Sequence, residues 1–440
     1  MRIENNQEKN SKKDISLNLE PISSHLLKAT VKIPSNLTSI IHTQTVESYK
    51  QSAFLPGFKK TETPQEYIEE SYKNEIELTL KGLLFKHVVL DFLMDQMFQK
   101  KIPLANYPRL DNIQATPNKE INFLFNISIS DPLELKEWKN FVFRAPKRKK
   151  YKDLDKQVTL FLKRETSLFK KQPPDTVQEN DWVSFQATML NKNQKPILEQ
   201  HTKTYWLKVN NKYLTRPFQS LLLNKKLGES FITNNIPLKN ELSDEAENNK
   251  YLFLIKIKGI TKGNHLSLET FKTNFKLKSK LDVHKKLIEI FSYRNDISQR
   301  KSIIEELFHL LLSKHRFEVP KHFIIRRQED ILQSLRQHPD YQVYKQQKDF
   351  LAQIAMLAEK QLAEEIIIDQ IAYKENITVE EQDIENYLSL FNNNRLKEFV
   401  YFKPLLEKIE DNDTPLQNGL LKQAILREKT LNYILHTLTK

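Results

Sequence analysis

LPGFKKTETP, residues 55–64, predicts a displayed loop between two helical segments. Gly57 permits a backbone turn with a positive φ, and the proline that ends the stretch suits the first position of the following helix. Phe58 offers an apolar anchor, while Lys59 and Lys60 offer positive charges to carboxylate or phosphate groups. Taken alone, these residues are typical of an ordinary turn with a tethering aromatic. The functional alternative is a loop that grips a partner surface.

The composition excludes much catalytic chemistry. The chain has 440 residues, a formal net charge of +13 and no cysteine. This length allows about three domains, and the positive charge favours an acidic partner such as nucleic acid or an anionic surface. The lack of cysteine excludes disulfides and thiolate metal sites, and it is compatible with a reducing compartment. The six glycines are not clustered, so phosphate-binding loops and dinucleotide fingerprints are excluded, and no cofactor is expected.

The sequence shows neither a signal peptide nor a membrane span. The N-terminal residues lack the apolar core of a signal peptide, and no apolar run reaches about 18 residues. We therefore expect a cytoplasmic protein without a membrane partner. The histidines show no metal-ligand spacing, and Gly-x-Ser-x-Gly is absent, so neither a metal site nor an α/β-hydrolase is expected.

Hydrophobic periodicity divides the chain into parts. Residues 1–132 form an α+β unit, with alternating strands near 15–19, 29–33 and 121–129 around helices that end near residue 100. From 178 to 262 the pattern predicts a small antiparallel sheet. From 263 to 440 the apolar spacing is helical.

Residues 133–177 are interpreted as a connector. It contains the basic cluster Arg144-Ala145-Pro146-Lys147-Arg148-Lys149-Lys150-Tyr151-Lys152, in which six of nine residues are cationic. A nucleic-acid contact would fit this cluster, but a solvated linker face is the commoner interpretation, because the only aromatic residue in the cluster is its tyrosine.

The order of these parts and the loop signature resemble the trigger factor family of ribosome-associated bacterial chaperones. The family's signature is Gly-Phe-Arg-x-Gly-Lys-x-Pro. Gly57, Phe58 and Pro64 match it, Lys59 replaces the arginine, and Lys60 matches a common lysine. The next two residues, Thr-Glu, replace the usual Gly-Lys, which makes the loop less flexible and less cationic. A Val-Pro pair at 319–320 resembles the opening of one of the family's long C-terminal helices.

This resemblance implies a multidomain α+β fold. It comprises a ribosome-binding α+β domain (1–132), a linker that packs with the C-terminal domain (133–177), a small FKBP-like antiparallel β domain (178–262) and an all-α chaperone domain with helical arms (263–440). The implied ribosome-binding residues are Gly57, Phe58, Lys59 and Lys60.

The resemblance also implies function and partners. It implies an ATP-independent chaperone that holds nascent chains at the ribosomal exit tunnel and assists their folding and export. The family is also associated with cell division. The implied partners are ribosomal protein and RNA near the tunnel, unfolded nascent polypeptides and, off the ribosome, a second copy in a homodimer.

The family's FKBP-type insert is a prolyl isomerase, and here its pocket departs from the pattern. Tyr205 and Phe218 fall on two pocket aromatics, but the family's Ile-Pro-Gly-Phe becomes Thr-Arg-Pro-Phe at 215–218. The family's Asp-Phe or Asp-Tyr becomes Gln186-Ala187. We therefore expect weak or absent isomerase activity. For Tyr205 and Phe218, a purely structural role and a role in the pocket are equally good interpretations.

Two other functions remain open. Prolyl isomerisation would be the main activity if the helical domain at 263–440 only delivered substrate to the middle domain. Alternatively, an RNA-binding protein would use Lys147 to Lys152 and show steep salt dependence.

Overall fold

The computed structural model describes most of the chain. The described residues are 15–52, 55–59, 62–115, 120–144, 153–171, 176–191, 193–196, 202–210, 217–234, 236, 252–262, 268, 271–272, 277–295, 297–336, 339–392, 400–404 and 415–439. Within them, no helix is both long enough and apolar enough to cross a membrane.

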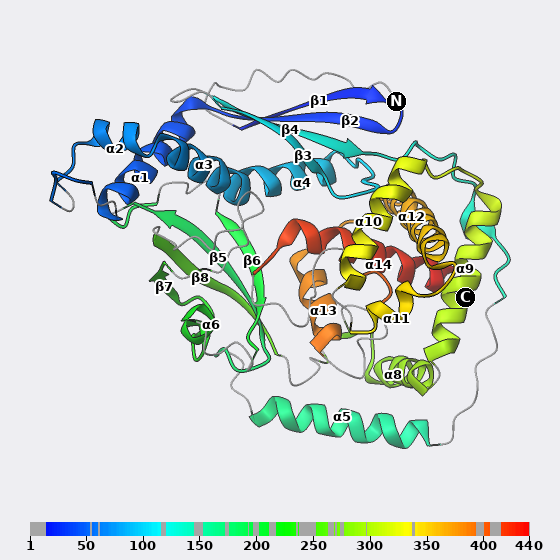
Figure 1. Cartoon of the computed structure of the whole chain (residues 1–440). Helices are drawn as coiled ribbons and strands as arrows, with labels where there is room; N and C mark the ends of the chain where they lie inside the picture. The colour runs from blue at the N-terminus through cyan, green and yellow to red at the C-terminus, as the bar shows by residue number, and fades with distance from the viewer. Residues whose placement is uncertain are drawn as a thin grey trace.

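An antiparallel sheet and the helices that follow its second strand form the N-terminal part (Figure 1). The strand order is β1-β2-β4-β3. The strands are β1 (Ser16–Ser23), β2 (Leu26–Ile33), β3 (Arg109–Ala115) and β4 (Ile121–Ser128). Val31 pairs with Phe123 across the central strands, and alternate residues of both strands are fully buried, as the period of two predicts. β3 is the strand of this sheet that the sequence pattern did not predict.

The helices beside this sheet end near residue 100, as predicted. Two features divide the predicted helix that follows Pro64: a break at Tyr72 and a π-helical turn. The helices are α1 (Ser35–Ser52), α2 (Gln65–Ser71), α3 (Lys73–Leu84), the π-helical turn η1 (Phe85–Val89) and α4 (Leu90–Gln99). The predicted stretch from Pro64 breaks at Tyr72, where φ is −117° and ψ is 27°. Pro64 has an extended ψ of 144°, and its carbonyl accepts a hydrogen bond from the Ile68 N–H, so it is the N-cap residue directly before α2.

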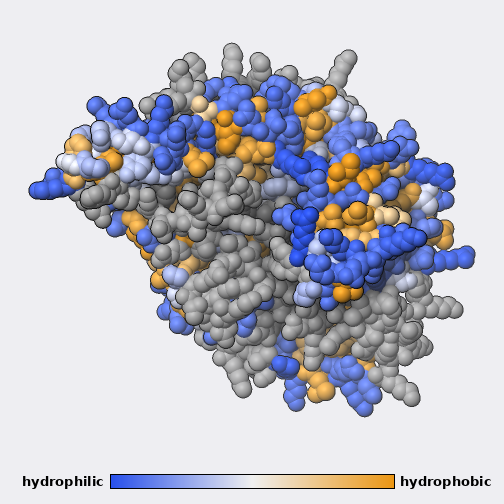
Figure 2. Space-filling view, in the orientation of Figure 1, coloured by the Kyte–Doolittle hydropathy of each residue, from blue (hydrophilic) through white to orange (hydrophobic). Residues whose placement is uncertain are grey.

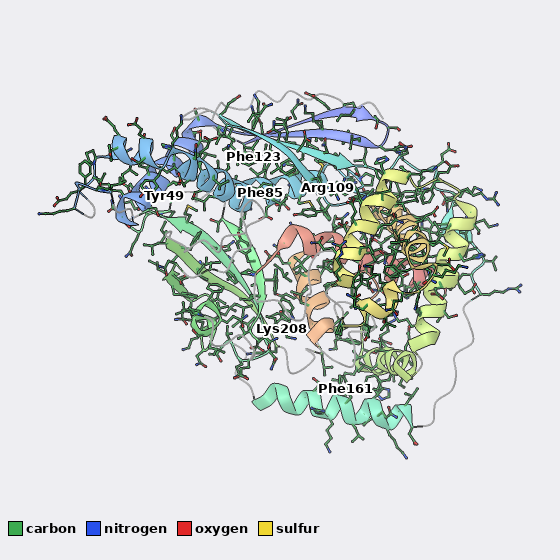
Figure 3. The ribbon with its side chains drawn as sticks, in the orientation of Figure 1. Tyr49, Phe85, Arg109, Phe123, Phe161 and Lys208 are labelled. Atoms are coloured by element: carbon green, nitrogen blue, oxygen red, sulfur yellow. The ribbon has the colours of Figure 1, made fainter. Side chains whose placement is uncertain are left out.

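The segment interpreted as a connector contains regular structure. It holds the short 3₁₀ helix η2 (Trp138–Asn140) and the 18-residue helix α5 (Leu154–Lys171). Phe161 of α5 lies edge-on to Phe291 with ring centroids 5.2 Å apart, and Figure 3 shows Phe161 on the side of α5 that faces the helical half. Of the basic cluster, only Arg144 is among the described residues.

A second antiparallel sheet has the strand order β7-β8-β5-β6-β9. It contains β5 (Trp182–Leu190), β6 (Lys203–Lys208), β7 (Ser230–Thr233), β8 (Leu252–Thr261) and the helix α6 (Pro217–Leu222). Its last strand, β9 (Leu416–Gln417), comes from the C-terminal part and pairs with β6. The sheet is therefore completed by residues far outside 178–262.

The C-terminal half is helical, as predicted. Its helices are α8 (Lys280–Asn295), α9 (Ile297–Lys314), α10 (Lys321–Arg336), α11 (Tyr341–Lys345), α12 (Phe350–Lys374), α13 (Glu381–Asn392) and α14 (Asn418–Leu438). Pro320 precedes α10, and its carbonyl accepts hydrogen bonds from the backbone N–H groups of Phe323 and Ile324. The predicted helix start at Val-Pro is confirmed. The predicted fold class is also confirmed, while the domain boundaries stay a prediction.

A buried charge network connects the helical half to the N-terminal part. Arg427 of α14 binds both carboxylate oxygens of Asp369 at 2.9 and 2.8 Å and one oxygen of Glu365 at 2.7 Å. Arg327 of α10 makes a bidentate pair with Glu365 at 2.8 and 2.7 Å. The same two arginines donate to the backbone carbonyls of residues 104 and 105, which follow α4. The helical half is thus fixed to the N-terminal part by charge-assisted hydrogen bonds.

Candidate functional site

The predicted docking loop lies at one end of the N-terminal part, between α1 and α2 (Figure 1). Gly57 has φ = +89°, a left-handed conformation that L side chains rarely adopt. The Phe58 N–H donates to the Leu55 carbonyl at 3.2 Å, and the Glu62 N–H donates to the Lys59 carbonyl at 3.0 Å. The first of these bonds closes a tight turn over residues 55–58. Lys60, the remaining predicted binding residue, lies outside the described residues.

The base of the loop is anchored by a small apolar cluster. Val46, Ile68 and Ile76 are buried together, one from each of α1, α2 and α3, and Leu55 packs against them. Because the loop begins at this packed residue, the cluster holds its base while the residues beyond it are displayed. The sequence provides this support at helical spacing, through Val46 and Tyr49 on α1 and through Ile68, Tyr72 and Ile76 along α2 and α3.

The tip of the loop presents an aromatic side chain and a cation to solvent. Phe58 is 37% exposed and Lys59 is exposed. The Phe58 ring lies 5.3 Å from the ring of Tyr67, centroid to centroid, at an interplanar angle of 47°. Tyr67 is 45% exposed. The structure therefore adds one aromatic to the predicted set, a residue that the signature did not include because it lies three positions beyond Pro64.

A second exposed feature lies on helices α10 to α12. Figure 2 shows hydrophobic surface over this part of the helical half. We define the α10–α12 apolar surface by its exposed large apolar side chains, which are Ile325, Val343, Tyr344, Leu351, Met356 and Leu357. α12 buries one stripe of residues, at 350, 354, 358 and 362, and it displays further apolar residues outside that stripe. A helix with a single buried face would normally carry polar residues there.

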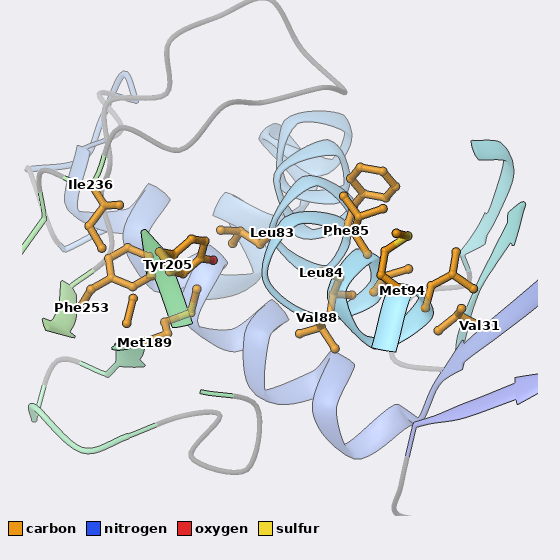
Figure 4. Packing of buried hydrophobic residues seen from close by; sticks show 14 of the residues in the cluster. Val31, Leu83, Leu84, Phe85, Val88, Met94, Met189, Tyr205, Ile236 and Phe253 are labelled. Carbon is orange, nitrogen blue, oxygen red and sulfur yellow. The ribbon is translucent and has the colours of Figure 1, made fainter. Parts of the chain in front are cut away.

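The two isomerase candidates are brought together, but inside a core. Tyr205 is 1% exposed and Phe218 is 2% exposed. Phe185 lies between them, with its ring centroid 5.8 Å from Tyr205 in a stacked arrangement and 5.3 Å from Phe218, edge-on. Figure 4 shows Tyr205 beside other buried residues of this sheet, with Leu83 of α3 nearby. The aromatic faces that a prolyl ring would need are therefore occupied by protein side chains.

A buried ion pair helps to hold this sheet against the N-terminal part. The Lys203 ammonium of β6 lies 3.0 Å from the Asp91 carboxylate of α4, and both groups are largely buried. Burial lowers the pKa of Lys203 despite the opposing effect of Asp91. Burial, with a smaller contribution from Asp91, raises the pKa of Tyr205 well above its usual value. The Tyr205 phenol is therefore neutral near pH 7, and its ring packs within the apolar core of this sheet.

Family profiles match both ends of the chain. Residues 15–160 match the profile described as bacterial trigger factor protein (TF), and residues 280–436 match that of the bacterial trigger factor protein (TF) C-terminus. Together the two matches cover about two thirds of the chain. The sheet-forming region between residues 160 and 280 lies outside both.

Curated relatives are similar over most of their length. The trigger factor of Desulforamulus reducens is 22% identical over 86% of this chain and 88% of its own. That of Geobacter sulfurreducens is 20% identical over 94% and 99%, and trigger factor 1 of Desulfitobacterium hafniense is 20% identical over 96% and 99%. A solved structure of the trigger factor chaperone is 16% identical, with a TM-score of 0.34 over 95% of this chain and 99% of that one.

Proposed function

Because the chain belongs to the trigger factor family, we propose that it is an ATP-independent chaperone that docks on the ribosome near the exit tunnel and holds unfolded nascent chains. The observation that carries this proposal is the pairing of an anchored, displayed loop with a separate exposed apolar surface on one chain. The loop provides attachment and the apolar surface provides nondirectional binding of unfolded segments. Ribosome attachment supports a cytoplasmic location.

The docking residues in this proposal are Gly57, Phe58, Lys59 and Lys60. The geometry of the first three supports it, since a left-handed glycine turns the chain so that the exposed ring and ammonium follow at the tip. Lys60 enters through the signature alone. A homodimer off the ribosome stays a prediction from the family resemblance.

The client surface in this proposal is the α10–α12 apolar surface. Burial of apolar area contributes roughly 25 cal/mol per Å², and it needs no fixed partner geometry. A flexible chain can therefore bind there and leave again when it folds, without nucleotide hydrolysis. This mechanism requires apolar residues that stay exposed in the free protein, as Leu351 and Met356 do.

The experiment that tests this function measures suppression of aggregation of a denatured model protein. We expect the variant Ile325→Ser, Leu351→Ser, Met356→Ser to need at least about tenfold more protein for half-maximal suppression, because three exposed apolar contacts are lost. The substituted side chains do not belong to the buried core, so the fold should persist. Circular dichroism checks this.

The matched control removes equally exposed apolar side chains elsewhere. Leu160 of α5 and Leu281 of α8 are about as exposed as Leu351 and Met356. We expect the variant Leu160→Ser, Leu281→Ser to suppress aggregation like the wild type. Equal loss in both variants would show that general surface hydrophobicity, rather than this surface, holds clients.

We also propose that the middle sheet has weak or absent prolyl isomerase activity. The burial of Tyr205 and Phe218 supports this, because an isomerase must receive a prolyl ring while the amide crosses a barrier of about 18–20 kcal/mol. The purified full-length chain should leave the isomerisation rate of a prolyl test peptide within about twofold of the uncatalysed rate. The uncatalysed reaction takes roughly tens to hundreds of seconds. A rate typical of an isomerase would contradict this, and would favour isomerisation as the main activity.

A further inference from the structure

The outer face of α5 carries exposed cations. Because Leu154, Val158 and Phe161 pack in one cluster with residues of α8, the opposite side of α5 faces solvent. Lys156 and Lys163 lie on that side and are exposed. Figure 1 shows α5 along one edge of the molecule, away from the loop between α1 and α2. The outer face of α5 is therefore a cationic surface separate from the candidate docking loop.

These cations are available to a partner. Arg164 follows Lys163 and is also exposed, and within the described part of the chain neither side chain has an ion-pair partner. Lys156 lies 3.3 Å from the Asp153 carboxylate, but the two side chains are 81% and 63% exposed, so water screens this pair. A partner anion therefore has little internal competition for these groups.

Helix α8 adds two cations beside this face. The Nε2 atom of His284 on α8 lies 3.4 Å from the Thr159 hydroxyl and 3.7 Å from the Asp155 carboxylate, which places this part of α8 against α5. Lys280 and Lys285, on either side of His284 in the sequence, are exposed. We define the α5–α8 basic surface by these exposed cations, which are Lys156, Lys163, Arg164, Lys280 and Lys285.

The sequence around α5 makes the local charge strongly positive. Residues 144–171 contain eleven Lys and Arg and three Asp and Glu, which gives +8 in a chain whose net charge is +13. The basic cluster before α5 contributes to this total through the sequence alone, and no contact is assigned to its residues. A high density of charge of one sign attracts a polyanion.

The residue types on the α5–α8 basic surface favour phosphate over a protein or a membrane. Lys is depleted at protein interfaces, whereas aromatic residues are enriched, and among the described residues of α5 and α8 no aromatic ring is exposed. A membrane-binding helix presents an apolar face to lipid, but α5 buries its apolar stripe and exposes only Leu160 among its described large apolar side chains. Lys and Arg are the residues that neutralise a phosphate backbone.

The same composition indicates which form of nucleic acid fits. Single-stranded nucleic acid is bound through aromatic rings on which bases stack, and the described residues of this surface offer none. Double-helical RNA is bound mostly through its shape and its phosphates. Cations on an exposed helix face suit the second mode.

We propose that the α5–α8 basic surface binds the phosphate backbone of double-helical RNA. The choice of RNA over DNA rests on the ribosome attachment proposed above, which brings the chain close to RNA, while the surface itself requires neither the loop nor the client surface. Sequence-independent phosphate binding has a Kd of about 10⁻⁴ to 10⁻⁶ M at physiological salt. Such binding adds to ribosome attachment but is too weak to replace the loop.

Fluorescence anisotropy of a labelled RNA duplex of about 20 base pairs, titrated with the full-length chain, tests this inference. We expect the variant Lys156→Gln, Lys163→Gln, Arg164→Gln to bind at least about tenfold more weakly than wild type at about 0.1 M salt. The slope of log affinity against log salt should become shallower by about 2–3, because each lost phosphate contact removes about one unit. Circular dichroism checks that the variant is folded.

The matched control removes three exposed cations elsewhere. The variant Arg336→Gln, Lys345→Gln, Lys348→Gln lowers the net charge equally, and all three side chains are exposed. It should bind the duplex within about twofold of wild type, since general charge acts weakly at a distance in salt. The loop variant Phe58→Ala, Lys59→Ala, Lys60→Ala should also bind the duplex like wild type, even if it no longer binds ribosomes.

Several outcomes would overturn the inference. If the α5 variant binds the duplex like wild type, or if the control variant weakens binding equally, the α5–α8 basic surface is not the RNA site. Tighter binding of the wild type to a DNA duplex, to poly-glutamate or to phosphatidylglycerol vesicles than to RNA would contradict the assigned partner class. Loss of duplex binding in the loop variant alone would place the RNA contact at the loop.

Discussion

Replacing Arg427 with methionine is expected to lower the free energy of unfolding by about 3–5 kcal/mol, because it leaves a buried carboxylate without its charged partner. Arg427 binds Asp369 through two hydrogen bonds, and both side chains are almost fully buried. Burial raises the pKa of Asp369 and outweighs the opposing effect of Arg427. Glu365 is less affected by the change, since it keeps its bidentate pair with Arg327. Denaturant unfolding followed by circular dichroism measures the loss.

The same variant should show a distinctive pH dependence. Without Arg427, the folded-state pKa of Asp369 rises further above its unfolded value of about 3.9, so the folded state prefers the protonated carboxyl. The free-energy penalty of ionising Asp369 in the folded variant is absent below the unfolded-state pKa. It grows as the pH rises toward the folded-state pKa. The deficit relative to wild type should therefore be smaller near about pH 4.5 than near about pH 8.

Two further variants separate charge from packing. Adding Asp369→Asn to Arg427→Met removes the unpaired charge and should restore part of the stability, most clearly at the higher pH. Lys422→Met serves as the control on the same helix, because Lys422 pairs with the half-exposed Asp95 and its loss should cost less than about 1 kcal/mol. Equal destabilisation by Lys422→Met and Arg427→Met would contradict the role assigned to burial.

Local sequence patterns predicted the elements that depend on local physics. The alternation of apolar residues from 121 to 129 identified β4, since Ile121, Phe123, Phe125 and Ile127 face the same side of the sheet and are buried. Val319-Pro320 identified the start of α10, because proline has no N–H to lose at a helix start. The signature identified the turn at Gly57 for a similar reason: a positive φ favours glycine.

Features that depend on distant parts of the chain could not be predicted in this way. β9 supplies two residues to a sheet more than 150 positions earlier, and a two-residue strand has no periodicity. The partners in the buried charge network, such as Arg327 and Glu365, look like ordinary exposed helix residues in sequence. α5 had a detectable signal in Leu154, Val158 and Phe161 at helical spacing, but the adjacent basic cluster drew the interpretation toward a connector.

The same distinction between local sequence patterns and features of the whole fold applies to the candidate sites. Phe58 and Lys59 were predicted because a contiguous signature carries them, and the structure places both at an exposed tip. Tyr67 and the α10–α12 apolar surface required the fold, since core and surface positions of a helix cannot be separated by residue type alone. For Tyr205 and Phe218, the family resemblance named the residues, and their burial beside Phe185 came only from the structure.

The second large effect is expected at the ribosome. The variant Phe58→Ala, Lys59→Ala, Lys60→Ala removes the apolar anchor and both cations of the loop, so its affinity for ribosomes should fall at least about 100-fold. The control variant Lys73→Ala, Leu78→Ala, Lys100→Ala removes two lysines and one exposed apolar side chain from the same part of the protein. It should bind like the wild type, because none of its three residues belongs to the loop.

Cosedimentation of the wild type and these two variants with ribosomes tests whether the loop at residues 55–64 is the docking site. We expect the wild type and the control to pellet with ribosomes, while the loop variant, still folded by circular dichroism, stays in the supernatant. If the loop variant pellets as the wild type does, the loop is not the docking site, and the basic cluster at 144–152 becomes the surface to test.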